Sequence, residues 1–385
     1  MQRRAFVRRS LAVTLAAPAA LHLDRATLSA TSPARSPDSL GVVPFQRGPA
    51  RLASNENPLG VPDSARQAIV EAIAEGNRYP RLNARVAEAL ARRNGVQLDN
   101  VVLGNGSAEI LQMTVQAASA GGTDVRVIVA DPTFEQVERY ATAMHARIVK
   151  VPLLANWSHD LDGMRAAALA SAGPTLVFIC NPNNPTGTLT SCDDIAVLLR
   201  SLPDDTWFLI DEAYLEYAHD PGYRPFIAEA TSRPNTVVSR TFSKIYGLAG
   251  IRLGYAIGTA DTIARVSDHA AATNINHLAT AAALACLDDD AYVDRSLDVN
   301  RQGMTFAART LDELGIEYLP SHANFVMHRI RGELRDYIDG MRENNVNVGR
   351  AFPPMLGWNR VSIGLPWEMQ AWATALGRMR IRGLA

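Results

Sequence analysis

The chain has 385 residues, of which 47% are apolar and 20% charged, and this globular composition excludes a disordered or collagen-like protein. Its formal net charge of −1 gives no support for a broad nucleic-acid-binding surface. The three cysteines, Cys180, Cys192 and Cys286, are too few for a disulfide framework, and no zinc-type cluster has ligand spacing. We therefore expect no metal ion and no nucleic-acid partner.

The N-terminus combines a basic stretch with a short apolar one. Residues 1–30 contain five arginines and one aspartate, and residues 11–23 are mostly small and apolar. This is the pattern of a secretory signal, and the Arg3-Arg4 pair followed by Ala-Phe resembles a twin-arginine signal, which exports folded proteins. The apolar run is too short for a stable membrane span. We predict a signal over 1–30 and an extended arm over 31–60. The alternatives are a basic amphipathic arm or a misplaced start codon, with the protein then in the cytoplasm.

Residues 61–275 alternate amphipathic helical segments with short apolar segments. This alternation predicts an α/β fold, a large domain whose mostly parallel sheet is sandwiched by helices. The expected strands are 101–103, 125–130, 148–152, 176–180, 207–210 and 236–239. The expected helices are 64–75, 81–94, 109–119, 134–145 and, at the end of the region, 270–287.

Residues 276–385 change in character, and we predict a smaller α+β domain there. A long helix is expected over 292–314. The expected strands are 316–319, 325–328, 346–348 and 360–363. The expected helices between and after them are 332–344 and 367–380.

Lysine is rare in this chain, and this narrows the search for a reactive amine. Only Lys150 and Lys244 are lysines among the 38 basic residues. Lys150 follows an apolar segment and has no polar motif around it, which is typical of a surface lysine. Lys244 lies in a motif rich in hydroxyl groups, so it is the candidate for chemistry that requires a primary amine.

Four polar motifs follow expected strands, at the end where ligands bind in open α/β sheets. The first, residues 104–109, is a Gly-Asn-Gly turn leading into a helix, whose N-terminal N–H groups can bind a phosphate. The second, residues 181–187, is Asn-Pro-Asn-Asn-Pro-Thr-Gly, whose amides could hold an aromatic hydroxyl. The same residues also favour a simple tight turn, so this motif alone is ambiguous.

The third and fourth motifs supply opposite charges. Asp211 ends a buried strand, where an acid is costly unless a cation such as a protonated pyridine nitrogen or Mg²⁺ pairs with it. The chain lacks a Walker-type phosphate loop, which disfavours magnesium. The fourth motif, residues 241–254, contains Lys244; burial and nearby cations lower a lysine pKa, as nucleophilic attack requires. It also contains three natural phosphate ligands, Thr241, Ser243 and Arg252.

Together these motifs resemble the pyridoxal-phosphate (PLP) aminotransferases of fold type I, class I/II. The resemblance covers roughly residues 40–385 and is closest to the histidinol-phosphate aminotransferase group, because Ser-Asn-Glu-Asn-Pro-Leu-Gly at 54–60 and Arg-Tyr-Pro at 78–80 match that group. It implies PLP as cofactor. It also implies a ping-pong transfer of an amino group between an L-amino acid, or histidinol phosphate, and a 2-oxo acid.

The resemblance implies a role for each residue around the cofactor ring. Lys244 would form a Schiff base with the cofactor and then move a proton. Asp211 would pair with the pyridine N–H and keep the ring an electron sink. Tyr214 and Asn184 would bind the 3-hydroxyl, and Phe134 would stack on the ring.

The resemblance also implies how the cofactor phosphate is bound. The implied ligands are Ser107, Ala108, Ser243 and Arg252, with Thr241 nearby. Tyr79 would reach the phosphate of the neighbouring subunit's cofactor, so the resemblance implies a homodimer.

The implied substrate contacts are centred on Arg360, which would clamp a carboxylate in a bidentate pair. Further candidates are Asn324, Arg350 and Asn57, although Arg350 could equally be a surface arginine. One departure concerns the substrate: Pro44-Phe45 stands where the group often has Pro-Tyr, and phenylalanine lacks the hydroxyl that would bind a phosphate. An apolar or aromatic amino acid is therefore as well supported as histidinol phosphate.

Two other functions are compatible with parts of the pattern. A decarboxylase or lyase on the same fold would share the residues that bind the ring, because these do not determine which bond breaks. A non-catalytic PLP-binding regulator would carry a basic DNA-binding domain. Residues 1–50 are too short and too apolar for such a domain, and the set Lys244, Asp211, Tyr214 and Arg360 favours catalysis.

Overall fold

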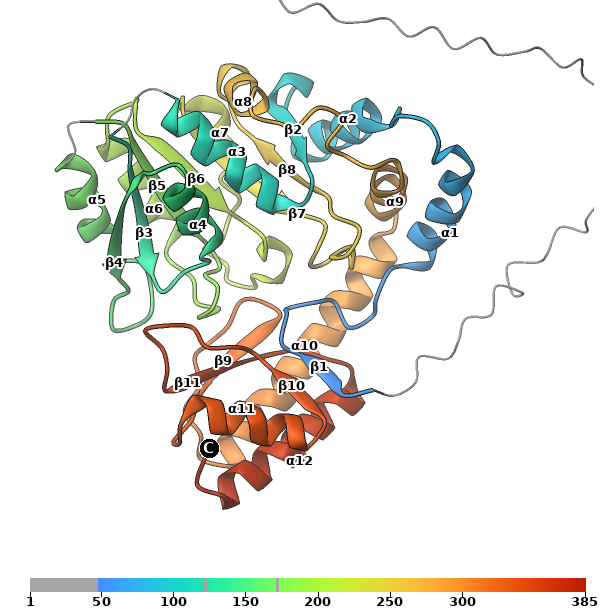
Figure 1. Cartoon of the computed structure of the whole chain (residues 1–385), viewed down its shortest axis with the longest axis vertical. Coiled ribbons are helices and arrows are strands. Elements are labelled where there is room, and N and C mark those ends of the chain that lie inside the picture. The colour runs from blue at the N-terminus through green and yellow to red at the C-terminus, as the bar shows by residue number, and fades with distance from the viewer. Residues whose placement is uncertain (1–47, 121–123, 171–172) are drawn as a thin grey trace, which may run out of the picture. The chain divides into compact units, whose positions relative to one another are not determined.

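The computed structural model describes residues 48–120, 124–170 and 173–385 (Figure 1). The predicted signal over 1–30, the arm up to residue 47 and the Pro44-Phe45 pair lie outside the described residues. Within the part that is described, no helix is long and apolar enough to cross a bilayer.

A seven-stranded sheet forms the centre of the fold. Its strand order is β2-β8-β7-β6-β5-β3-β4, and β8 alone runs antiparallel to its neighbours. All six strands expected for this region are present. The strands are β2 (Val101–Gly104), β3 (Arg126–Asp131), β4 (Arg147–Pro152), β5 (Thr175–Cys180), β6 (Trp207–Asp211), β7 (Thr236–Thr241) and β8 (Gly254–Ile257), the last of which the sequence analysis did not include.

Helices cover both faces of this sheet, because its central strands are apolar on both sides. In β5, Leu176 and Phe178 point to one core while Val177 and Ile179 point to the other. The first core includes α3 (Ser107–Ser119), α4 (Gln136–Ala143) and α8 (Ala260–Ser267). The second includes α5 (Leu161–Leu169), α6 (Cys192–Ser201) and α7 (Ile227–Ser232). The expected sandwich of a mostly parallel sheet between helices is confirmed.

A further helical layer packs beside β2 and β8. It consists of α1 (Asp63–Ala72), α2 (Asn83–Asn94) and α9 (His277–Leu287), which share one core. The expected helix over 270–287 was wrong in its first part. The side chain of Asn276 caps α9 by accepting the N–H of Ala279 at 2.7 Å, so the helix begins only at His277.

The C-terminal region contains two small sheets and three helices. Strand β1 (Ala50–Leu52) pairs in parallel with β10 (Val346–Val348), and β9 (Phe325–Arg329) pairs antiparallel with β11 (Trp358–Ser362). The helices are α10 (Asp290–Glu313), α11 (Leu334–Glu343) and α12 (Pro366–Ile381). The strand expected at 316–319 is not formed; only Tyr318 makes an isolated bridge, to His328. The domain boundary at residue 275 stays a prediction.

The register of the large sheet brings the motif-bearing strand ends together. Cys180, Asp211 and Ser239 lie side by side across β5, β6 and β7. Because these strands are parallel, the segments that follow them leave the sheet at the same edge. The second, third and fourth motifs therefore meet at one place.

Candidate active site

The candidate reactive amine, Lys244, lies in the turn after β7. Its Nζ donates a hydrogen bond to the backbone oxygen of Asn55 at 3.1 Å and lies 5.7 Å from the ring centre of Tyr214. Burial and the nearby Arg360 guanidinium lower the pKa of Lys244 to about 8, although Asp211 acts in the opposite direction. The neutral amine, which a nucleophile or proton acceptor needs, is therefore far more populated near neutral pH than for an ordinary lysine, at roughly a tenth of the molecules at pH 7.

Asp211 ends β6 with its side chain in the interior. The residue is 2% exposed, and its Oδ1 has no hydrogen-bond partner among the described residues. Burial raises the pKa of Asp211 to about 7, and the positive charge of Lys244 partly opposes this. A buried carboxylate oxygen without a partner requires a donor to bind there.

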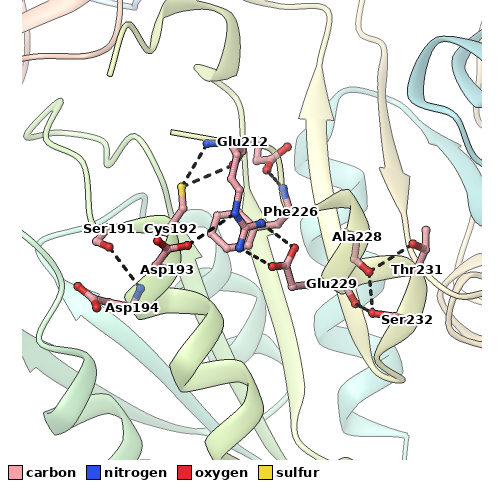
Figure 2. A network of polar contacts seen from close by, with 11 residues as sticks. Ser191, Cys192, Asp193, Asp194, Glu212, Phe226, Ala228, Glu229, Thr231 and Ser232 are labelled. Atoms are coloured by element: carbon pink, nitrogen blue, oxygen red, sulfur yellow. Dashed lines mark hydrogen bonds and ion pairs between the residues drawn. The ribbon is translucent and has the colours of Figure 1, made fainter. Parts of the chain in front are cut away.

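The neighbouring acid, Glu212, points the other way and stabilises the end of β6. Its Oε1 accepts from the N–H of Phe226 at 2.7 Å (Figure 2). Its Oε2 accepts from Arg240 Nε at 2.8 Å. The same network continues through Arg224, which makes two hydrogen bonds to Glu229 on α7. Glu212 is thus fully used by the fold, which leaves Asp211 as the acid available to a ligand.

An anion cradle lies where α3 begins beside the turn after β7. Gly106 caps α3 without any side-chain bond to the first turn, so the N–H groups of Ser107 and Ala108 are available. Arg252 Nη1 donates to Ser243 Oγ at 3.3 Å at the same place. Gly106 has a φ of 75°, a left-handed conformation that favours glycine, and a Cβ there would displace the Arg252 guanidinium from the cradle.

The backbone around this cradle is specialised. Arg252 has a φ of 68°, a left-handed conformation that is uncommon for a residue other than glycine. A Cβ on Gly254 would collide with the backbone nitrogen of Ser107, so this glycine lets β8 approach the start of α3. Thr241 Oγ1 accepts from the N–H of Ser243 at 3.0 Å and shapes the turn that presents Ser243.

Asn55 connects the parts of the site, although the sequence analysis assigned it no role. Its Nδ2 donates to the hydroxyl of Tyr214 at 2.9 Å, and its backbone oxygen accepts from Lys244 and from Asn324. Its Oδ1 accepts from Ser362 Oγ at 3.0 Å. The signal was present, because Asn55 belongs to the Ser-Asn-Glu-Asn motif, but these contacts span 159 to 307 residues of sequence.

Arg360 on β11 is a buried cation facing Asn184. It is 7% exposed; Nη1 donates to Asn184 Oδ1 at 2.6 Å, and Nη2 donates to the backbone oxygen of Ala53 at 2.9 Å. Its Nε has no partner within the described chain, and no carboxylate there pairs with it. Burial lowers the pKa of Arg360 to about 10, so the group is still charged at neutral pH. An unpaired buried guanidinium is a site for an anion.

Part of this set lines a cavity of about 640 Å³, whereas Asp211, Tyr214, Ser243 and Arg252 are not among its lining residues. Its lining includes Lys244, Asn184, Phe134, Arg350 and Arg360. Phe134 follows β3 and is partly exposed toward this space, as a residue that stacks on a flat ring would be. The cavity is large enough for a cofactor-sized and a substrate-sized molecule together.

Three other predicted residues have different surroundings. Asn57 is buried away from the cavity and donates to Ile245 O and Ser296 Oγ, both at 2.9 Å, so it supports the lysine turn. Asn324 donates to Asn55 O at 3.1 Å. Tyr79 is 81% exposed on the surface of this chain and does not line the cavity.

The residues fit PLP. The unpartnered Asp211 oxygen suits a pyridine N–H, the start of α3 with Ser243 and Arg252 suits a phosphate, and Lys244 suits its aldehyde. When bound, PLP supplies an electron sink for the pair of electrons released at the substrate's α-carbon. Asp211 would hold the ring nitrogen protonated, Tyr214 and Asn184 would hold the 3-hydroxyl, and Lys244 would carry the proton.

Comparisons with known proteins identify the family of this chain. The family model for aminotransferase class I and II matches residues 48–375. Histidinol-phosphate aminotransferase of Moorella thermoacetica is 37% identical over 331 residues, which is 85% of this chain and 84% of that protein. Histidinol-phosphate aminotransferase 2 of Ralstonia nicotianae is 39% identical over 333 residues, covering 85% and 87%. The crystal structure of the Sinorhizobium meliloti histidinol-phosphate aminotransferase with pyridoxal-5'-phosphate has 28% identity and a TM-score of 0.80, covering 86% of this chain and 91% of that one.

The fold and the site define a PLP-dependent enzyme of fold type I. The chain belongs to the aminotransferase class I and II family, and its cofactor is PLP. It transfers amino groups, as the sequence analysis predicted, and the relatives favour this over the decarboxylase or lyase alternative.

Proposed function

We propose that Arg360 is the anion seat for both substrates of this aminotransferase, with Lys244 as the group that removes and returns the α-proton. The observation that carries the proposal is the buried Arg360 guanidinium, which has no carboxylate partner among the described residues and lines the same cavity as Lys244. An α-carboxylate placed on Arg360 orients the amine of the donor toward Lys244. In the second half-reaction the 2-oxo acid takes the same place.

The amino donor has two candidates. Histidinol phosphate is the first, because the relatives at 37–39% identity bear its name, and its phosphate would occupy Arg360. An L-amino acid with an apolar or aromatic side chain is the second. This candidate is favoured by the ion pair between Arg350 and Glu135, which already neutralises another guanidinium that lines the cavity.

Lys244 has the properties of a proton carrier in this reaction. Its pKa of about 8 lies close to neutral pH, where a general base and its conjugate acid are both present. Its hydrogen bond to Asn55 O, in turn, holds the amine at one wall of the cavity. Asn55 also binds Tyr214, so a change at Asn55 should disturb both groups.

Half-transamination by the holoenzyme tests this function. The protein is mixed with each donor of a panel without any oxo acid, and the loss of cofactor absorbance is followed in a single turnover. We expect one equivalent of carbonyl product per active site, a 2-oxo acid from an amino acid or a ketone from histidinol phosphate, and no carbon dioxide or free ammonia. Release of carbon dioxide or of free ammonia without an acceptor would favour a decarboxylase or lyase instead.

We also propose that the enzyme is a homodimer in which Tyr79 binds the partner's cofactor phosphate. The high exposure of Tyr79 in the single chain supports a role in an interface, as do the exposed Val70 and Ile73 nearby in sequence. Tyr79→Phe should weaken PLP binding several-fold and leave the dimer intact by light scattering. Unchanged PLP affinity in this variant would exclude the contact.

Export is a separate proposal that depends on the sequence alone. We propose that residues 1–30 direct the folded protein through the twin-arginine route. Replacing Arg3 and Arg4 with lysine should retain the protein in the cytoplasmic fraction. Unchanged export would exclude this route.

A further inference from the structure

The hydroxyl of Tyr214 makes one hydrogen bond within the described part of the chain, and it is the acceptor in that bond. Asn55 Nδ2 donates to it at 2.9 Å. An amide NH2 group only donates, so the tyrosine oxygen accepts and its own proton points elsewhere. Tyr214 is 2% exposed, and a buried hydroxyl proton without an acceptor needs one from a bound molecule.

Ser362, the last residue of β11, determines which way the Asn55 amide faces. The backbone N–H of Asn55 donates to Ser362 Oγ at 2.8 Å, so this oxygen is already an acceptor. The Ser362 hydroxyl proton is then donated to Asn55 Oδ1 at 3.0 Å. Because the amide oxygen faces Ser362, the amide nitrogen faces Tyr214. The bonds therefore run in one direction, from Ser362 through Asn55 to Tyr214.

Packing holds this arrangement as well as hydrogen bonds. Ser362 is the register partner of Phe325 in the sheet formed by β9 and β11. The Phe325 ring lies edge-on to the Tyr214 ring, with 5.3 Å between the ring centres. Asn55 and Ser362 are each 2% exposed, so water does not compete for their hydrogen bonds. The small sheet thus contacts Tyr214 both directly and through Asn55.

The titratable and charged groups around the Tyr214 hydroxyl lie on several segments packed against it. Burial is the main cause that raises the pKa of Tyr214 well above its usual value. Arg360 on β11 opposes this, whereas Cys180 on β5 and Asp211 on β6 add to it. Lys244 Nζ lies 5.7 Å from the ring centre. The hydroxyl therefore keeps its proton at neutral pH and is available as a donor.

We propose that Ser362 and Asn55 are positioning residues that direct the Tyr214 hydroxyl proton toward the 3-oxygen of PLP. The inference rests on the proposed function only through the role of Tyr214 at the 3-hydroxyl. A hydrogen bond from Tyr214 stabilises negative charge on that oxygen. This weakens the attraction between the oxygen and the proton on the nitrogen that joins Lys244 to the cofactor. That nitrogen then loses its proton at a lower pH.

A pH titration of the holoenzyme's cofactor absorbance, without any amino donor, measures this effect. Its midpoint is the pH at which the nitrogen between Lys244 and PLP loses its proton. Tyr214→Phe removes the donor and should raise the midpoint by about 1 to 2 pH units. Asn55→Asp has the shape of asparagine but offers only acceptor oxygens, so it should turn the Tyr214 proton away from the cofactor. We expect a similar rise in this variant.

The Asn55→Asp variant also adds a negative charge, and a double variant separates charge from proton direction. If Asn55 acts through the Tyr214 proton, Asn55→Asp should shift the midpoint in the Tyr214→Phe background by less than half of its shift in wild type. Ser362→Ala adds no charge. It should raise the midpoint by about 0.3 to 1 pH unit when Tyr214 is present and leave it unchanged in Tyr214→Phe.

Thr262→Val is the matched control for the loss of a buried hydroxyl. Thr262 Oγ1 accepts the backbone N–H of Asn235 at 3.0 Å, much as Ser362 Oγ accepts that of Asn55, and Thr262 does not line the cavity. Thr262→Val and Ser362→Ala should both lower the thermal unfolding midpoint of the cofactor-free protein. Only Ser362→Ala should shift the midpoint of the absorbance titration.

Equal shifts by Asn55→Asp with and without the Tyr214 hydroxyl would overturn the proposal, because the added charge alone would then explain them. An absorbance midpoint of Ser362→Ala equal to that of Thr262→Val would also overturn it. If Asn55→Asp does not fold, Ser362→Ala with and without Tyr214→Phe decides the question. Because no donor is present, a failure of the proposed anion seat at Arg360 would leave these midpoints unaffected, so the two failures are distinguishable.

Discussion

The floor and the wall of the active site are built differently. The floor, formed by Asp211, Lys244 and Arg252, lies on segments that leave adjacent strands of the large sheet. The wall, formed by Arg350, Phe352 and Arg360, belongs to the C-terminal region around β10 and β11. The floor residues suit the chemical groups of PLP. The wall carries arginines whose ion pairing depends on neighbouring side chains. The proposed roles thus assign the chemistry to the sheet and the choice of substrate to the wall.

The largest expected effect comes from the floor. Lys244→Ala should lower turnover by at least about 10³-fold, because the variant loses both the nucleophilic amine and the proton carrier. It should also lose the absorbance of the bond between lysine and cofactor. Lys150→Ala is the matched control, since Lys150 pairs with Glu138 outside the cavity, and it should retain full activity. Normal turnover by Lys244→Ala would contradict the assignment of the floor.

The raised pKa of Asp211 should make the free energy of unfolding of the cofactor-free protein depend on pH. Its folded pKa of about 7 is higher than the unfolded value of 3.8, so the folded state binds the extra proton. This group therefore makes the wild type less stable as pH rises from about 4 to 7. Asp211→Asn should remove that loss and be more stable than wild type at pH 8, by roughly 2–4 kcal/mol, but not at pH 4. Urea unfolding of both proteins at pH 4 and pH 8 measures this difference in the free energy of unfolding.

Added PLP should counteract the higher stability of Asp211→Asn over wild type at pH 8. The cofactor's pyridine nitrogen would pair with the ionised Asp211, so PLP should stabilise the wild type more than Asp211→Asn. An equal stabilisation of both proteins by PLP would show that Asp211 does not face the ring nitrogen, whereas parallel pH profiles without cofactor would show that burial does not raise the pKa of Asp211.

The phosphate cradle should give a smaller effect confined to cofactor binding. Arg252→Gln should raise the dissociation constant of PLP by about 10- to 100-fold, because a charged hydrogen bond to the phosphate is lost. Arg335→Gln is the control, since the Arg335 side chain is 91% exposed on α11. Titration of the cofactor-free proteins with PLP measures both. Equal affinities of the two variants for PLP would show that Arg252 does not bind the cofactor phosphate.

The floor is more predictable from the sequence than the wall, for a physical reason. Parallel strands bring their carboxyl ends to one edge, so the polar motifs after β5, β6 and β7 can be placed together from the residue pattern alone. Strand β8 was missed because its four residues follow the lysine motif directly and have no separate pattern. Helix α8 was missed for a similar reason, since its eight residues give a short periodic signal.

The wall depends on contacts that no local pattern contains. The bond of Arg360 to Asn184 spans 176 residues, and the Glu135–Arg350 pair joins two loops on different parts of the fold. The role of Asn55 was hidden in the same way: its motif was recognised, but its bonds to Tyr214 and Ser362 form only when the chain has folded. The roles of the individual site residues stay predictions until these variants are measured.

The most direct test of the shared anion seat compares both half-reactions in Arg360→Gln. Norvaline serves as the donor for the first half-reaction and 2-oxoglutarate as the acceptor for the second, each followed in a single turnover. Because both α-carboxylates would bind the same guanidinium, kcat/KM should fall by about 10²- to 10³-fold in both, and by similar factors. A large loss in one half-reaction with little change in the other would show that donor and acceptor use different seats and would contradict the account.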